Sequence, residues 1–172
     1  MPIPEDIRHD LNDWAHLTSR QRVDLMQRIE NHEASKTNRP PAHVELREMQ
    51  PAQRGAYEPD THTIAQNRDM VILMDDPHTA LINVLHEGRH AFQYDAIEHP
   101  GRHRELSLND HLLFRQGVSN YTPPEKDFYA YFNNPIEQDA RAFAEARERE
   151  YGLTESREQT QTRTHEHEHR RC

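Results

Sequence analysis

The chain has a single cysteine, Cys172 at its last position, so no disulfide can form within it. A packed core must therefore support the fold, which suits a reducing compartment. No apolar run approaches the roughly 18 residues of a membrane-spanning helix. The first residues are acidic and lack the apolar segment of a secretory signal. We therefore expect a cytoplasmic protein, or one exported by a signal-independent secretion system, without a membrane partner.

Apolar residues and positive charge are also scarce. Hydrophobic residues make up 33% of the 172 residues, which predicts one modest core with polar extensions rather than two full domains. The formal net charge is −9 at pH 7, whereas nucleic-acid binding requires a cationic surface. We therefore expect no nucleic-acid partner. The acidic charge would suit a basic substrate, but solubility explains it equally well.

A pair of histidines four residues apart is the most informative feature that is present. His86 and His90 flank Glu87 in an HExxH pattern. Because the chain holds 14 histidines, about 0.1 chance matches are expected, so the surrounding residues must decide. A second match, at residues 165–169, lies in a polar tail without an apolar face, and composition accounts for it.

The residues around the first match predict a helix over about residues 77–94. Asp76 followed by proline is typical of an N-cap and a first helical position. Apolar residues then recur at helical spacing, namely Leu81, Val84, Leu85 and Phe92. On such a helix His86 and His90 share one side with Glu87 beside them, which is the arrangement that holds zinc and activates water. The alternative is an exposed amphipathic helix with two solvated histidines.

A peptidase zinc site needs three protein ligands and one open position, and Glu137 is the best candidate for the third ligand. A second helix is predicted to begin at Asn134-Pro135, with an apolar stripe of Ile136, Ala140, Phe143 and Ala144. Glu137 lies on or beside that stripe, where a buried carboxylate needs a partner such as a metal ion. The alternative is a capping box, in which Glu137 binds only the backbone amide of Asn134.

With these two helices the sequence resembles the zincin metallopeptidases of the gluzincin type, which carry HExxH on one helix and a glutamate ligand on a later one. Residues 137–144 are similar to the ExxA(N/D/R)xFA signature of compact bacterial members, including ImmA/IrrE-like proteins and polymorphic-toxin metallopeptidase domains. Residues 55–70 resemble the turn and strand that precede HExxH in such proteins, and the resemblance covers about residues 55–151. It implies that residues 63–66 form an edge strand that pairs with bound substrate.

Gly88 departs from this resemblance, because the family often has a large aliphatic residue at that position. Glycine inside a helix costs about 1 kcal/mol relative to alanine. The residue therefore suggests that a backbone segment or a substrate passes close to that turn.

The resemblance implies an α+β, mainly helical, zincin-like fold with a short sheet, and a zinc-dependent endopeptidase acting on a protein or peptide. His86, His90 and Glu137 would hold Zn²⁺, and Glu87 would be the general base. Three residues have the chemistry to stabilise the oxyanion, and none of them is preferred: Tyr129, Tyr131 and His103.

Other functions are compatible with the same sequence. One is a non-catalytic zincin-like protein that binds a partner or sequesters metal, although such a protein would not need Glu87. Another is a regulatory protease with a single cognate protein substrate, which would need a separate DNA-binding partner because no helix-turn-helix is recognisable. The small size and the resemblance suggest a bacterial toxin or effector, with a delivery or immunity protein as partner.

Three segments are predicted along the chain. Residues 1–50 read as a helical pair that packs on or precedes the core, and Thr18-x-x-Gln21 is a capping-box start for its second helix. Residues 51–155 form the zincin-like core, in which residues 95–134 contribute a cleft wall with short helices opened by Asn109-Asp110 and by residues 122–127. Residues 156–172 form a disordered, His-rich tail that could bind metal weakly.

Overall fold

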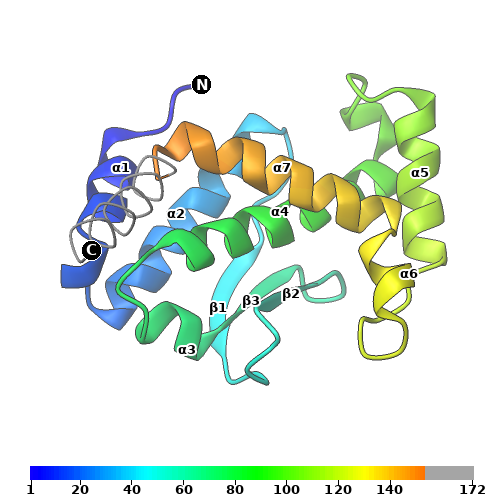
Figure 1. Ribbon diagram of the computed structural model, residues 1–172. Helices are drawn as coiled ribbons and strands as arrows, with labels where there is room; N and C mark the ends of the chain where they lie inside the picture. The colour runs from blue at the N-terminus through cyan, green and yellow to red at the C-terminus, as the bar shows by residue number, and fades with distance from the viewer. Residues whose placement is uncertain (154–172) are drawn as a thin grey trace, which may run out of the picture.

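Helices account for most of residues 1–153, the part of the chain that the computed structural model describes, and a three-stranded sheet packs beside them (Figure 1). The helices are α1 (Glu5–Asn12), α2 (Ser19–Lys36), α3 (Arg68–Ile72), α4 (His78–Glu98), α5 (Leu108–Ser119), α6 (Phe128–Phe132) and α7 (Pro135–Tyr151), with short 3-10 turns η1 (Trp14–His16) and η2 (Pro100–Arg102). The strands are β1 (His43–Arg47), β2 (Gly55–Glu58) and β3 (Thr63–Asn67). The predicted α+β class with a short sheet is confirmed.

The predictions for residues 156–172, including the second HExxH match, lie outside the described residues. Among residues 1–153, no helix is both long enough and apolar enough to cross a membrane.

The sheet has the order β1-β3-β2, with β1 parallel and β2 antiparallel to β3. The prediction that residues 63–66 form an edge strand is therefore wrong, because β3 is paired on both sides. All five residues of β3 are buried, as expected for a central strand. The edge beside α4 is β2 instead, whereas β1 packs against α2. Strand β1 lies in the first fifty residues, which we predicted to be helical, and its alternation of polar and apolar residues was the overlooked signal.

Helix α4 runs through the middle of the molecule and contacts α2, α7 and the sheet (Figure 1). It is longer than predicted, because it continues to Glu98. The predicted N-cap at Asp76 is wrong by one residue, because Pro77 is the N-cap and His78 the first helical residue, although the Asp76 carboxylate accepts a hydrogen bond of 2.9 Å from the amide of His78. The larger core cluster joins α4 residues such as Leu81 and Leu85 to Ile64 of β3. The metal-ligand candidates of α4 thus sit on a helix that is fixed on several sides.

The N-terminal helices pack on this same cluster. Ile7 and Leu11 of α1 and Leu25 of α2 belong to it. The predicted capping box at the start of α2 is confirmed, because the Gln21 amide donates to the Thr18 hydroxyl (3.2 Å) and the Thr18 amide donates to the Gln21 side chain (2.8 Å).

Helices α5 and α6 lie together at one end of the molecule, beside the N-terminal end of α7 (Figure 1). The predicted cap of α5 at Asn109-Asp110 is wrong in register. Ser107 is the N-cap, and Asp110 is the third helical residue that completes a capping box with it. For α6, the segment 122–127 precedes the helix as expected, and the Asp127 side chain accepts a hydrogen bond from the Ala130 amide.

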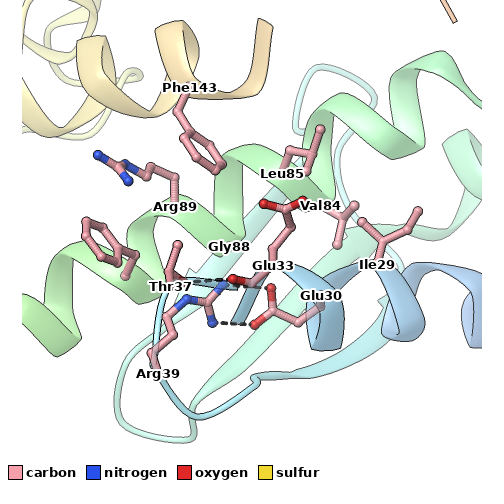
Figure 2. A pocket seen from close by; sticks show the side chains of 11 residues that line it. Ile29, Glu30, Glu33, Thr37, Arg39, Val84, Leu85, Gly88, Arg89 and Phe143 are labelled. Atoms are coloured by element: carbon pink, nitrogen blue, oxygen red, sulfur yellow. Dashed lines mark hydrogen bonds and ion pairs between the residues drawn. The ribbon is translucent and has the colours of Figure 1, made fainter. Parts of the chain in front are cut away.

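Gly88 faces a buried ion pair, so the prediction that a backbone segment or substrate passes there is wrong. A Cβ atom at residue 88 would lie 2.7 Å from a carboxylate oxygen of Glu30 and 3.3 Å from the guanidinium of Arg39. Arg39 donates two hydrogen bonds to Glu30, of 2.6 and 3.0 Å, and Figure 2 shows the pair next to Gly88. A large aliphatic residue at position 88 would displace this pair, which explains why glycine stands there. Residue 88 is two positions from both His86 and His90, so it lies on roughly the opposite side of α4.

Candidate metal centre

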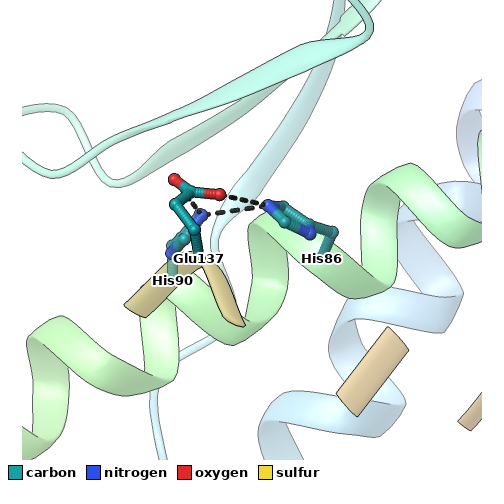
Figure 3. Close-up of side chains that lie close together, drawn as sticks. All are labelled: His86, His90 and Glu137. Carbon is teal, nitrogen blue, oxygen red and sulfur yellow. Dashed lines mark hydrogen bonds and ion pairs between the residues drawn. The ribbon is translucent and has the colours of Figure 1, made fainter. Parts of the chain in front are cut away.

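Two imidazoles and one carboxylate converge between α4 and α7 (Figure 3). The Nε2 atom of His86 lies 3.1 Å from Nε2 of His90 and 3.1 Å from one carboxylate oxygen of Glu137. The other carboxylate oxygen lies 3.3 Å from Nε2 of His90. Among residues 1–153, this is the group of three His, Cys, Asp or Glu side chains that could hold a metal ion. The structure therefore brings together the three side chains predicted as ligands.

The spacing of these donor atoms fits a tetrahedral metal ion. In such zinc sites nitrogen and oxygen ligands lie about 2.0–2.1 Å from the ion, which puts neighbouring ligands about 3.3–3.4 Å apart. The 3.1 Å between the two imidazole nitrogens and the 3.1 Å from His86 to one oxygen of Glu137 are each close to an edge of that tetrahedron, and one donor atom from each of the three residues lies within 4.8 Å of the others. Three protein donors leave the fourth corner open, as in catalytic rather than structural zinc sites.

The structure excludes the alternative role of Glu137 as a capping residue. The Asn134 amide donates to the Tyr131 carbonyl oxygen (3.1 Å) rather than to Glu137. The start of α7 is capped by the Asn134 side chain, which accepts a hydrogen bond of 3.0 Å from the Ile136 amide. Because the cap is complete without it, the Glu137 side chain is free to point at the two histidines. It is 3% exposed.

The three groups shift each other's protonation. Burial by itself would lower the pKa of His90, but the hydrogen bond with Glu137 and the nearby charge of Glu87 raise it to about 9. Burial by itself would raise the pKa of Glu137, but its hydrogen bonds with both histidines lower that pKa well below the usual range. In the metal-free protein a proton on His90 thus supplies the positive charge beside Glu137 that a bound metal ion would otherwise supply.

Metal binding should therefore depend steeply on pH. Because an incoming ion must displace the His90 proton, we expect its apparent affinity to rise about tenfold per pH unit up to pH 9, the raised pKa. Zinc titrations against a competing chelator between pH 6 and 9 would measure this slope, and a flat profile would contradict it.

In the metal-free protein the raised pKa of His90 stabilises the fold fully below about pH 6.5 and progressively less towards pH 9. The lowered pKa of Glu137 stabilises it above about pH 4.5, and this contribution is lost as the pH falls.

Glu87 is a buried carboxylate that is left without a bonding partner. It is 7% exposed and, among the described residues, forms no hydrogen bond or ion pair. Its charge nevertheless acts on His90 and on two nearby tyrosines, Tyr121 and Tyr131, so it lies beside the metal group. The Glu87 oxygens are not among the fully enclosed polar atoms without a partner in residues 1–153, so a water molecule can reach them.

The three residues considered for stabilising the oxyanion lie at different distances from the metal group. Tyr131 lies near the site, because the charge of Glu137 contributes, after burial, to raising the pKa of its hydroxyl. Tyr129 is 79% exposed, and His103 is buried elsewhere with its Nε2 atom 2.5 Å from Asp95. Sequence reasoning missed Tyr121, whose ring packs edge-on against that of Tyr131 at 6.3 Å. Burial and the charges of Glu137 and Glu87 raise the pKa of Tyr121 to about 12 and also raise that of Tyr131, so both phenols are neutral donors near pH 7.

No protein-family model, curated protein or solved structure matches this chain.

Sequence reasoning also missed the groups that surround His90. Its Nδ1 atom is hydrogen-bonded with Gln93 (2.8 Å), which in turn contacts Asp139 of α7. Asp139 is also paired with Arg89, whose guanidinium lies over the rings of Phe92 and Phe143. The one local signal was that Gln93 lies three residues after His90 and hence on the same side of α4.

Proposed function

We propose that this protein is a zinc-dependent endopeptidase with a zincin-like, gluzincin-type site. His86, His90 and Glu137 would hold the metal, and Glu87 would act as general base. The observation that carries the proposal is the pairing of three donors at coordination spacing with an adjacent buried carboxylate that has no bonding partner. A protein that only stored metal would not need a carboxylate beside its ligands that pairs with none of them.

Zinc is the ion that best suits the donors. Two imidazole nitrogens and one carboxylate oxygen match the ligand set of catalytic zinc sites, whereas magnesium and calcium prefer six or more oxygen ligands. When bound, zinc would supply a Lewis acid and lower the pKa of a water molecule from about 15.7 towards 7.

The protein side chains would manage the proton and the developing charge. Glu87 would accept a proton as water attacks the peptide carbonyl, and would then donate it to the leaving amine. Tyr131 would donate its phenolic hydrogen to the oxyanion, since its raised pKa keeps it protonated. Tyr121, in ring contact with Tyr131, is the second phenol available for that task.

A protein or peptide substrate fits the surroundings of the site. Within residues 1–153, β2 pairs only with β3 and lies against α4, so one side of its backbone can pair with an extended peptide. Use as a bacterial toxin or effector, with a delivery or immunity protein as partner, is an extension of the proposal that rests on the family resemblance alone.

Metal content tests the proposal first. The full-length chain should carry His165→Ala, His167→Ala and His169→Ala to remove competing tail ligands, and is then compared with further His86→Ala and Glu137→Ala variants. We expect one zinc per chain by mass spectrometry, lost in both ligand variants and retained in the matched control His99→Ala, which changes an exposed histidine just beyond α4. Cleavage of a peptide library by the zinc-loaded protein then tests hydrolysis. A parent chain without stoichiometric zinc would refute the proposal.

A further inference from the structure

We propose that Gln93 is a positioning residue that sets the tautomer of His90 and links it to the helix turn carrying Glu137. This inference rests on the metal site of the proposed function. Gln93 is fully buried, at 0% exposed, and its three side-chain hydrogen bonds lie at the junction of α4 and α7.

The hydrogen bonds of Gln93 fix the orientation of its side-chain amide. Its Nε2 atom lies 2.9 Å from the carbonyl oxygen of Ile136 and 2.7 Å from a carboxylate oxygen of Asp139. Both partners can only accept hydrogen bonds at these atoms, so the NH₂ group of Gln93 must face them. Its carbonyl oxygen is then left to face Nδ1 of His90 at 2.8 Å.

This orientation determines how His90 can bind metal. An amide oxygen only accepts, so Nδ1 of His90 must carry the hydrogen. Once its other proton leaves, Nε2 presents a lone pair towards His86 and Glu137, as a ligand must. His86 has no such support, because its Nδ1 atom has no hydrogen-bond partner among residues 1–153.

Asp139 and Arg89 hold Gln93 in place from the far side. Arg89 donates two hydrogen bonds to Asp139, of 2.7 and 3.1 Å. Its guanidinium lies 4.3 Å from the ring centre of Phe92 and 4.8 Å from that of Phe143, and Figure 2 shows Arg89 beside Phe143. The chain of contacts from Arg89 through Asp139 and Gln93 to His90 thus crosses between the helices twice.

The same contacts couple the ligands on the two helices. Ile136 and Asp139 lie on either side of Glu137 in α7, and both accept hydrogen bonds from Gln93. A shift of α7 would therefore disturb Glu137 and the orientation of His90 together. Gln93 acts through these residues and has no contact of its own with the metal position.

The test compares Gln93→Leu with a matched control, Gln27→Leu, in the full-length chain lacking the three tail histidines. Gln27 also bridges two elements, since it donates to Ala42 (2.9 Å) and accepts from Val44 (2.8 Å), but it joins α2 to β1. We expect Gln93→Leu to weaken zinc binding about 10- to 100-fold in a chelator competition, and Gln27→Leu to leave it unchanged.

Two further variants guard against a misfolded Gln93→Leu protein. Gln93→Glu keeps an oxygen that accepts from His90, but it places a new carboxylate against that of Asp139. Zinc binding should therefore weaken. Adding Asp139→Asn restores a donor opposite the new carboxylate and should recover most of the affinity. Nitrogen-15 NMR of the zinc-loaded proteins gives a second signature. The Nδ1 proton signal of His90 should shift and exchange faster in Gln93→Leu, whereas that of His86 should not.

The outcomes separate this inference from the proposed function. Unchanged zinc affinity and an unchanged His90 signal in Gln93→Leu would overturn the role of Gln93 while leaving the peptidase proposal intact. A parent chain that binds zinc, shows the expected effects and cleaves no peptide would support Gln93 and remove the peptidase proposal. A parent chain that binds no zinc would overturn both.

Discussion

Replacing Glu87 with glutamine should lower kcat for peptide hydrolysis by about 10²- to 10⁴-fold while zinc content stays at the parent level. The substitution keeps the size of the side chain and removes only its ability to accept a proton. Because Glu87 bonds to no described residue, the change breaks no hydrogen bond or ion pair of the described structure. The loss should therefore appear in kcat, with little change in KM.

The matched control is Glu98→Gln, which changes an exposed glutamate at the end of the same helix. It should hydrolyse the library peptides at the parent rate. Steady-state kinetics on one cleaved peptide, with metal content measured on the same samples, gives the comparison. Full activity in the Glu87→Gln protein would show that another group accepts the proton.

Replacing Glu33 with alanine should lower the free energy of unfolding by about 3–5 kcal/mol, the usual cost of breaking a buried ion pair. Glu33 of α2 accepts hydrogen bonds from Arg147 of α7 at 2.5 and 3.1 Å, and another from the Tyr151 hydroxyl at 2.8 Å. Glu33 and Arg147 are 4% and 5% exposed. The substitution would leave the guanidinium of Arg147 buried beside α2 without its main partner.

Urea unfolding at neutral pH would measure this loss. The matched control is Asp6→Ala, which removes the 2.7 Å contact of Asp6 with Arg28 at the surface and should cost no more than about 1 kcal/mol. A double change of Glu33→Leu and Arg147→Met should recover most of the stability, because it removes both charges together. Equal losses for Glu33→Ala and Asp6→Ala would contradict the assignment of a buried pair.

The candidate ligands could be predicted because they depend mainly on local periodicity. His86 and His90 share one side of α4 through their spacing, and the apolar residues around them indicate a helix. Glu137 could be found because it lies beside a local apolar stripe. The competing capping role could not be excluded from sequence, since the spacing from Asn134 is identical in both cases. Only the position of α4, which brings His86 and His90 to Glu137, decides between the ligand role and the capping role.

Features that depend on distant residues escaped prediction. The place of β3 in the sheet is set by its pairing with β1 and β2, and strand order leaves no local trace in a five-residue strand. Gln93 reads as an ordinary helical residue, because its partner Asp139 lies on another helix. Gly88 was recognised as unusual, but the ion pair that it accommodates comes from α2 and the loop after it.

The position of the three donors on two helices has a consequence for the unfolded chain. His86 and Glu137 are 51 positions apart in the sequence, and an ion bound by both would cross-link the chain and close a loop of that length. By the chain-entropy relation used for cross-links, closing a loop of this length restricts the unfolded ensemble by about 4 kcal/mol. In a sequence that cannot form an internal disulfide, the metal would thus serve as its cross-link as well as its reactive centre.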